Sequence, residues 1–222
     1  MLDASKRFEA IYADDSLLVL NKSAGLLAVP GRGADKQDCL SSRVQQQYLD
    51  ALVVHRLDMA TSGLMLMARG KAIQGALSKL FAQREIGKRY VAVVDGSMAA
   101  LNTQLNDNGW GLIDLPMAPD WPRRPLQAVN EAIGKPSQTR WRIVTFDKAG
   151  KSTRVELEPV TGRTHQLRVH LQALGHPILG DALYAPAAVQ ARAPRLLLHA
   201  CALTFKHPAS GAHMVFESAP DF

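Results

Sequence analysis

The sequence predicts an α+β fold, with a mixed, mainly antiparallel central sheet flanked by helices and long loops. Short apolar runs typical of strands outnumber the segments with helical periodicity. The helical segments also do not alternate regularly with the strands, as they would in a parallel α/β protein. The chain has 222 residues, of which 47% are hydrophobic and 21% charged, so it has the composition of a globular protein rather than a disordered one.

The expected strands are short apolar or alternating segments bounded by polar residues and turns. The first is Leu17–Asn21, an apolar run that follows Asp14 and Asp15. Further strands are expected at 64–68, 90–94, 140–145, 153–157, 196–205 and 214–217. Between them, residues 95–138 are rich in glycine and proline and are predicted to form a long irregular excursion, a feature that is usually functional or disordered in compact domains.

Three segments have apolar residues at helical spacing. A surface helix is expected at 40–48, and a stronger apolar stripe predicts a helix over 71–84. The clearest helix signal lies at 164–175, where Thr164 is the expected N-cap and Gly175 the expected end. This helix places Arg168 beside its apolar stripe.

Cysteine usage and charge limit the classes of protein. Cys39 and Cys201 are far apart and lack metal-binding spacing, which argues against a zinc module and against a disulfide-rich secreted scaffold. Met1–Glu9 has no apolar core of a signal peptide, and no apolar stretch approaches the ~20 residues of a membrane span. We therefore expect a cytoplasmic protein that does not bind membranes. Its net charge of +6 suggests a polyanionic partner, although charge alone does not decide this.

The segment His55–Gly63 contains a histidine, an arginine, a carboxylate and two hydroxyl groups directly before a predicted strand. Asp58 in such a loop can stay ionised beside a cation and serve as a nucleophile or base. Alternatively, its side chain binds the backbone N–H groups of the turn at 61–63. Spacing alone leaves both interpretations open.

The segment Gly162–Arg168 is the second candidate. His165 and His170 are five residues apart, about 140° around a helix, so they are poor joint ligands for a metal ion. Arg163 and Arg168 can instead hold an anion near the start of this helix, or they are ordinary surface arginines.

Two further segments combine cations with aromatic rings. Lys88, Arg89 and Tyr90 open a predicted strand, and Trp121–Pro125 lies on the long excursion. This combination suits a phosphate together with a stacked base, but it also occurs on solvated loops. The common motifs for nucleotide hydrolysis, dinucleotide binding, zinc proteolysis and the serine nucleophile elbow are absent from the sequence.

The two long motifs, His55–Gly63 and Gly162–Arg168, with Lys88–Tyr90 between them, resemble the RluA family of pseudouridine synthases. The resemblance covers nearly the whole chain. Several further stretches are similar to a dual-specificity member that modifies 23S rRNA and tRNA: Ala24–Gly31, Asp58–Gly63, Asp114–Pro125, Gly175–Asp181 and Ala193–His199.

The resemblance implies the pseudouridine-synthase fold and an isomerase that needs neither cofactor nor metal. Asp58 matches the catalytic aspartate, as nucleophile or as base. Arg168 matches its ion-pair partner, Tyr90 the aromatic that stacks on the target base, and Leu167 the cover of the other face. The remaining substrate-binding residues are Arg56, which would enter the space that the flipped base leaves, His55, and the phosphate contacts Arg123 and Arg124.

The resemblance also implies structured RNA as the partner, namely the tRNA anticodon stem-loop and a similar hairpin of 23S rRNA. We expect a monomer with a single catalytic domain over 1–222 and no S4 RNA-binding domain. The stretch Gly96–Gly111 is longer than the family pattern leads us to expect. Three alternatives stay open: a synthase with another rRNA or tRNA target, a non-catalytic RNA-binding protein, and a hydrolase that uses Asp181 or Glu85 as a second carboxylate.

Overall fold

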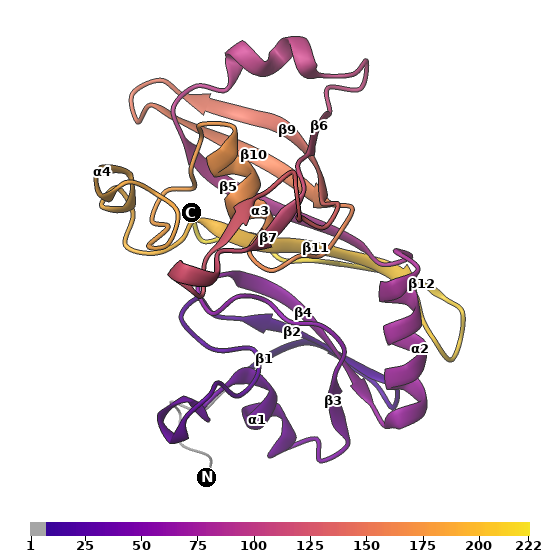
Figure 1. Cartoon of the computed structure of the whole chain (residues 1–222). Coiled ribbons are helices and arrows are strands. Elements are labelled where there is room, and N and C mark those ends of the chain that lie inside the picture. Colours follow the sequence, from indigo (N-terminus) through magenta and orange to yellow (C-terminus); the bar gives the residue numbers. More distant parts are fainter. Residues whose placement is uncertain (1–7) are drawn as a thin grey trace. The chain divides into compact units, whose positions relative to one another are not determined.

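The computed structural model describes residues 8–222, which form two compact units (Figure 1). Within the described residues, unit 1 comprises 8–88 and 199–221, and unit 2 comprises 89–198 together with Phe222. The first seven residues, which belong to the segment expected to lack a signal peptide, lie outside the described part. The expectation of one catalytic domain without an S4 module stays a prediction.

Unit 1 is built on a mixed sheet whose strands come from both ends of the chain. The antiparallel pairs are β1–β2, β2–β4, β3–β4 and β11–β12, and β4 pairs with β11 in parallel. The strands are β1 (Glu9–Ala13), β2 (Leu17–Lys22), β3 (Ala51–Val53), β4 (Ser62–Arg69), β11 (Leu198–Lys206, whose first residue belongs to unit 2) and β12 (His213–Glu217). The parallel pair requires Gly63, because a Cβ atom there would lie 2.3 Å from the carbonyl oxygen of Ala200.

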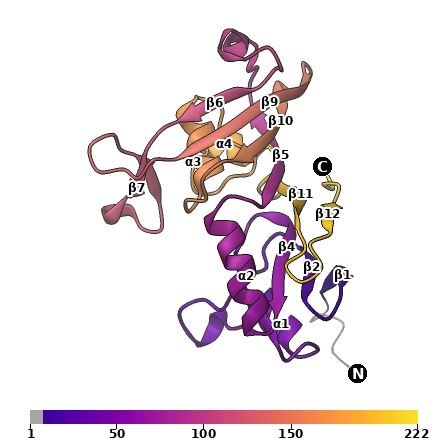
Figure 2. The ribbon, with the colours of Figure 1, turned by 90° about the vertical axis from the view of Figure 1, so that its right-hand side faces the viewer.

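Two helices accompany this sheet: α1 (Leu40–Gln45) and α2 (Lys71–Ala82). Helix α2 lies alongside β4 (Figure 2). Leu77 of α2 joins the buried core formed by Leu17, Leu66 and Phe205 of the strands. The predicted helical stripe over 71–84 is therefore confirmed, with the helix ending at Ala82. The surface helix expected at 40–48 is also present, but it ends at Gln45.

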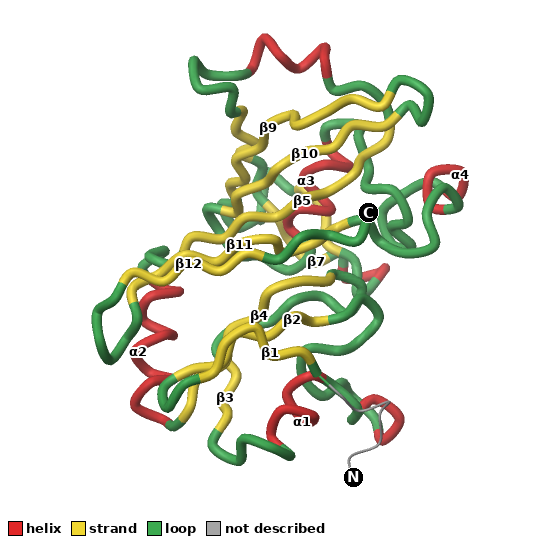
Figure 3. Tube along the Cα trace, turned by 180° about the vertical axis from the view of Figure 1, so that it is seen from behind, coloured by secondary structure: helices red, strands yellow, loops and turns green. Residues whose placement is uncertain are grey.

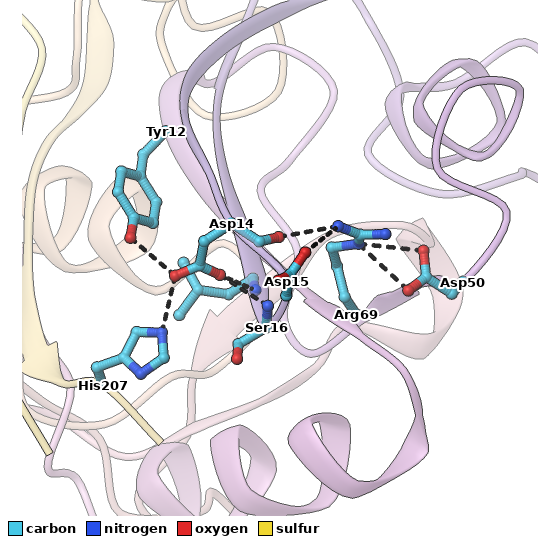
Figure 4. Close-up of polar contacts among 8 residues, drawn as sticks. Tyr12, Asp14, Asp15, Ser16, Asp50, Arg69 and His207 are labelled. Carbon is cyan, nitrogen blue, oxygen red and sulfur yellow. Dashed lines mark hydrogen bonds and ion pairs between the residues drawn. The ribbon is translucent and has the colours of Figure 1, made fainter. Parts of the chain in front are cut away.

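A polar network joins distant parts of unit 1 (Figure 4). Asp14 Oδ2 accepts a hydrogen bond from Tyr12 Oη at 2.7 Å and lies 3.0 Å from Nε2 of His207, 193 positions further along the chain. Arg69 donates to the main-chain oxygen of Asp14 and to the Asp50 carboxylate. Side chains thereby tie β1 and β4 to the end of β11.

Unit 2 contains an antiparallel sheet with the order β5–β10–β9–β6 and a separate hairpin of β7 and β8. The strands are β5 (Gly87–Asp95, whose first two residues belong to unit 1), β6 (Gly111–Asp114), β7 (Met117–Pro119), β8 (Gln127–Val129), β9 (Gln138–Asp147) and β10 (Ser152–Pro159). The helices are α3 (Gln166–Ala173) and the short α4 (Ala187–Gln190). Strands predominate over helices (Figure 3), in agreement with the predicted α+β class.

All strands expected from the sequence are present, with ends shifted by a few residues. The expectation of an irregular excursion over 95–138 is wrong, because that segment holds β6, β7, β8 and the 3-10 helices Ala99–Gln104 and Trp121–Arg123. Strands of three or four residues are too short to show an alternating pattern. The same reason explains why β3 was not expected.

Candidate active site

The predicted site residues are distributed over both units. In unit 1, Asp58 lies in the segment that joins β3 to β4. The main-chain oxygen of Asp58 accepts the N–H of Thr61 at 3.1 Å, and that of Met59 accepts the N–H of Gly25 at 2.8 Å. The main chain thus closes the turn after Asp58.

A buried lysine, which the sequence analysis missed, supports this segment. Lys22, at the end of β2, is 1% exposed. Its Nζ donates to the main-chain oxygens of Ser23 (2.9 Å), Leu26 (2.8 Å) and Met59 (3.0 Å). Burial lowers the pKa of Lys22 to about 8, and the negative charge of Asp58 acts in the opposite direction. The ammonium thereby fixes the segment around Asp58 and places a positive charge near its carboxylate.

His55 fixes the same segment from the other end. Its Nε2 accepts the N–H of Leu66 in β4 at 2.8 Å, and its ring lies 4.6 Å from that of Phe81, centroid to centroid. Burial lowers the pKa of His55 to about 3, and the nearby Lys88 ammonium contributes to this shift. His55 is therefore neutral, with Nε2 unprotonated. The hydrogen bond with Leu66 gives His55 a structural role, and a contact of His55 with the substrate stays a prediction. Arg56, the next residue, is exposed.

In unit 2, Arg168 of α3 forms a buried ion pair with Asp181. Arg168 Nε lies 2.8 Å from Asp181 Oδ2 and Nη2 lies 2.6 Å from Oδ1, with the two side chains 4% and 1% exposed. Asp181 Oδ1 also accepts the N–H groups of Leu183 and Tyr184. Asp181 is therefore a positioning partner of Arg168, which argues against its use as the second carboxylate of a hydrolase. The pairing of Arg168 with Asp58 stays a prediction.

The start of α3 differs from the expected cap. The N-cap residue is His165, in the left-handed region at φ 56°, and Thr164 is exposed, so the prediction of Thr164 as N-cap is wrong. The side chain of Gln166 holds this turn instead, because its Oε1 accepts from Thr161 Oγ1 at 2.7 Å and from Arg163 N at 3.0 Å. The sequence pattern of a capping box is absent, because Arg163 and not a serine or threonine stands three residues before Gln166.

The two histidines of this motif have separate partners. His165 Nδ1 lies 2.6 Å from the hydroxyl of Tyr184. His170 lies between Thr139 Oγ1 and the main-chain oxygen of Leu115, at 2.9 and 3.1 Å, and burial lowers its pKa. Across residues 8–222, no cluster of three or more histidine, cysteine, aspartate or glutamate residues is arranged to hold a metal ion.

The residues expected to contact the base also belong to unit 2. Tyr90 is half-buried on β5, opposite Leu157 of β10, and Leu167 is 7% exposed on α3, directly before Arg168. Arg89, beside Tyr90, forms an ion pair with Glu158. The contacts of Tyr90 and Leu167 with the base stay predictions.

The two arginines expected to bind phosphate lie between β7 and β8. Arg123 Nε donates to Asp120 Oδ2 at 2.7 Å, and its side chain is 72% exposed. The guanidinium carbon of Arg124 lies 3.4 Å from the ring centroid of Trp121. Their cationic groups are thus already oriented by neighbouring side chains.

Comparison with known proteins gives a consistent result. Residues 16–173 match the family described as RNA pseudouridylate synthase. The chain is 49% identical to the "Dual-specificity RNA pseudouridine synthase RluA" of Escherichia coli strain K12 over 212 residues, which cover 96% of this chain and 93% of the relative. It is 46% identical to the protein of the same name from Yersinia pestis, over 96% of this chain and 98% of the relative.

Solved structures agree at the level of the fold. The structure titled "Human RNA Pseudouridylate Synthase Domain Containing 1" superimposes with a TM-score of 0.78 at 26% identity, covering 100% of this chain and 87% of that chain. The human "Domain Containing 4" structure gives a TM-score of 0.72 at 24% identity, covering 96% of this chain and 89% of that chain.

Proposed function

Because the chain belongs to the RNA pseudouridylate synthase family, we propose that it isomerises uridine to pseudouridine in two RNAs, the anticodon stem-loop of tRNA and a similar hairpin of 23S rRNA. Because it belongs to this family, the chain is an RNA-modifying isomerase. Our proposal concerns its two RNA targets. The observation that carries it is the 49% identity, over nearly the full length of both chains, to a relative named for dual specificity.

The reaction breaks the N-glycosidic bond of the uridine, rotates the uracil and joins its C5 atom to the sugar, after which the C5 proton is lost to solvent. In the proposed mechanism Asp58 acts as an ionised carboxylate, as nucleophile toward the sugar or as base. Lys22 supports this role, because its buried ammonium interacts electrostatically with Asp58 and binds the main-chain oxygen of Met59, the residue after it. Arg168 provides the second cation of the proposed site.

Substrate recognition in the proposal uses the remaining predicted residues. A stacked uracil must leave its helix or loop, at a cost of a few kcal/mol, before it reaches Asp58. Tyr90 and Leu167 then hold the two faces of the base, and Arg56 fills the space that the base leaves. His55 orients the segment that carries Asp58. Arg123 and Arg124 contact phosphates.

The proposal also includes a monomeric enzyme that acts in the cytoplasm without a cofactor. In the described part of the chain, none of the helices has the length and apolar character that crossing a membrane requires. The structured RNA is its proposed partner.

The test is the release of tritium from tRNA and from 23S rRNA labelled at C5 of uracil. We expect release from both RNAs, and we expect Asp58→Asn to reduce it by about 1,000-fold, in the range of a lost acid–base group. A filter-binding measurement with the same variant should show that RNA is still bound. Release from only one RNA would contradict dual specificity, and release from neither, with folded protein, would overturn the proposed function.

A further inference from the structure

The β7–β8 hairpin, residues 117–129, carries an exposed aromatic ring. Between its two strands, Asp120 N donates to Leu126 O and Leu126 N donates to Arg123 O, which holds the 3-10 turn Trp121–Arg123 in place. Trp121 at the start of this turn is 62% exposed. The turn therefore presents an indole on a defined main-chain support.

The other two tryptophans are packed in the protein. Trp110 is 8% exposed and Trp141 is fully buried. Trp110 also lies beside two guanidinium groups, those of Arg140 and Arg142, at 4.6 and 4.9 Å. Trp121 thus differs from Trp110 by its exposure, since both are stacked with arginine but only Trp121 leaves most of its surface in water.

The partner of Trp121 is Arg124, whose guanidinium carbon lies 3.4 Å from the ring centroid. Such a stack covers one face of the indole with a cation, and the exposed area then belongs to the other face and the edge. Arg123 on the same turn is 72% exposed and forms an ion pair with Asp120, so the cation on the indole is that of Arg124. An open π-face with adjoining positive charge suits an unpaired nucleobase and its phosphate better than an apolar protein surface.

The hairpin is firmly attached to helix α3. The N–H of Gln127 donates to Tyr184 Oη at 3.0 Å, and the same hydroxyl lies 2.6 Å from His165 Nδ1 at the N-terminus of α3. Met117 of β7, Val169 of α3 and Tyr184 form a buried apolar cluster. A ligand on the hairpin is therefore held in a defined position relative to the helix that carries Leu167 and Arg168.

We propose that the stack of Trp121 and Arg124 is a binding site for an unpaired nucleobase of the RNA substrate, distinct from the uridine that reacts. This proposal rests on the proposed function. It assigns to the hairpin a contact with a base in addition to the expected contacts with phosphate.

The test combines protein variants with abasic RNA. The dissociation constant of the tRNA anticodon stem-loop is measured for the unchanged protein, for Trp121→Ala and for Trp121→Phe. We expect Trp121→Ala to weaken binding about 10-fold, in the range for one lost base–aromatic stack, and Trp121→Phe to retain most of the affinity. Ile133→Ala is the matched control, because Ile133 is an apolar residue with 72% exposure in the turn that follows β8 and should not change binding.

Abasic substitutions at each loop nucleotide then identify the base. At one position other than the reacting uridine, removal of the base should weaken binding to the unchanged protein about 10-fold and leave binding to Trp121→Ala nearly unchanged. Wild-type affinity for Trp121→Ala, or a loss that no abasic position reproduces, would overturn the base-binding site. Tritium release by the unchanged protein, measured in the same experiment, tests the proposed function separately.

Discussion

Two buried cations, Lys22 in unit 1 and Arg168 in unit 2, are held by opposite means. Lys22 is bonded to three neutral main-chain carbonyls, whereas Arg168 is bonded through two nitrogens to the carboxylate of Asp181. Carbonyl ligands satisfy the ammonium protons but leave its charge, which acts on Asp58. Asp181 instead compensates the charge of Arg168 and fixes its orientation. The positive charge of Lys22 in unit 1 therefore acts on the Asp58 carboxylate. In unit 2, Asp181 holds the guanidinium of Arg168 in a fixed orientation.

The largest expected effect comes from Asp181→Asn, which removes the carboxylate that binds Arg168 through two nitrogens in the interior. We expect the free energy of unfolding to fall by about 3–5 kcal/mol, as for other broken buried ion pairs. Urea unfolding measures it. The matched control is Asp38→Asn, which breaks a similar two-nitrogen contact with Arg43 where the Asp38 side chain is 58% exposed, and should cost at most about 1 kcal/mol. If both variants lost the same free energy of unfolding, the greater effect expected for the buried ion pair would be contradicted.

Lys22→Met tests the other cation and should cost about 2 kcal/mol at neutral pH, because buried carbonyls lose a donor. The pKa of Lys22 is about 8 when folded and 10.5 in its ordinary state, so between these pH values the unfolded chain binds more protons. The unfolding free energy of the unchanged protein should therefore rise with pH from about 8 to 10.5, relative to Lys22→Met. Urea unfolding across this range measures it, and parallel pH profiles for the two proteins would contradict the lowered pKa of Lys22 in the folded protein.

Tyr184→Phe has the smallest expected effect, about 1 kcal/mol, because it removes the hydroxyl and keeps the ring beside Arg168. Gln127 N–H then loses its acceptor, and its hydrogen exchange should become faster. Tyr12→Phe removes a hydroxyl in unit 1 and should leave the exchange of Gln127 unchanged. Unchanged exchange in Tyr184→Phe would show that the hairpin does not depend on this bond.

The sequence predicted elements whose pattern is local. The stripe of α2 and the apolar runs of β2 and β4 report burial directly, so these elements were expected at nearly their observed positions. The motifs also led to Asp58 and Arg168. The partners of these residues could not be predicted in this way, because Asp181 lies 13 positions from Arg168, and Lys22 lies 37 positions from Met59. A charged residue at the end of a strand has the same local pattern whether it faces solvent or a ring of carbonyls.

The strands of unit 1 come from both ends of the chain, so the two sheets cannot be completed at the same time during synthesis. Residues 89–198 of unit 2 leave the ribosome before β12 and nearly all of β11, so the antiparallel sheet β5–β10–β9–β6 can pair while β4 still lacks its parallel neighbour. The contact of His207 with Asp14 then forms among the last, across 193 positions. A ribosome-bound chain that ends before β11 would thus carry a paired unit 2 sheet, while β4, the strand that follows Asp58, lacks its neighbour at Ser62 and Gly63.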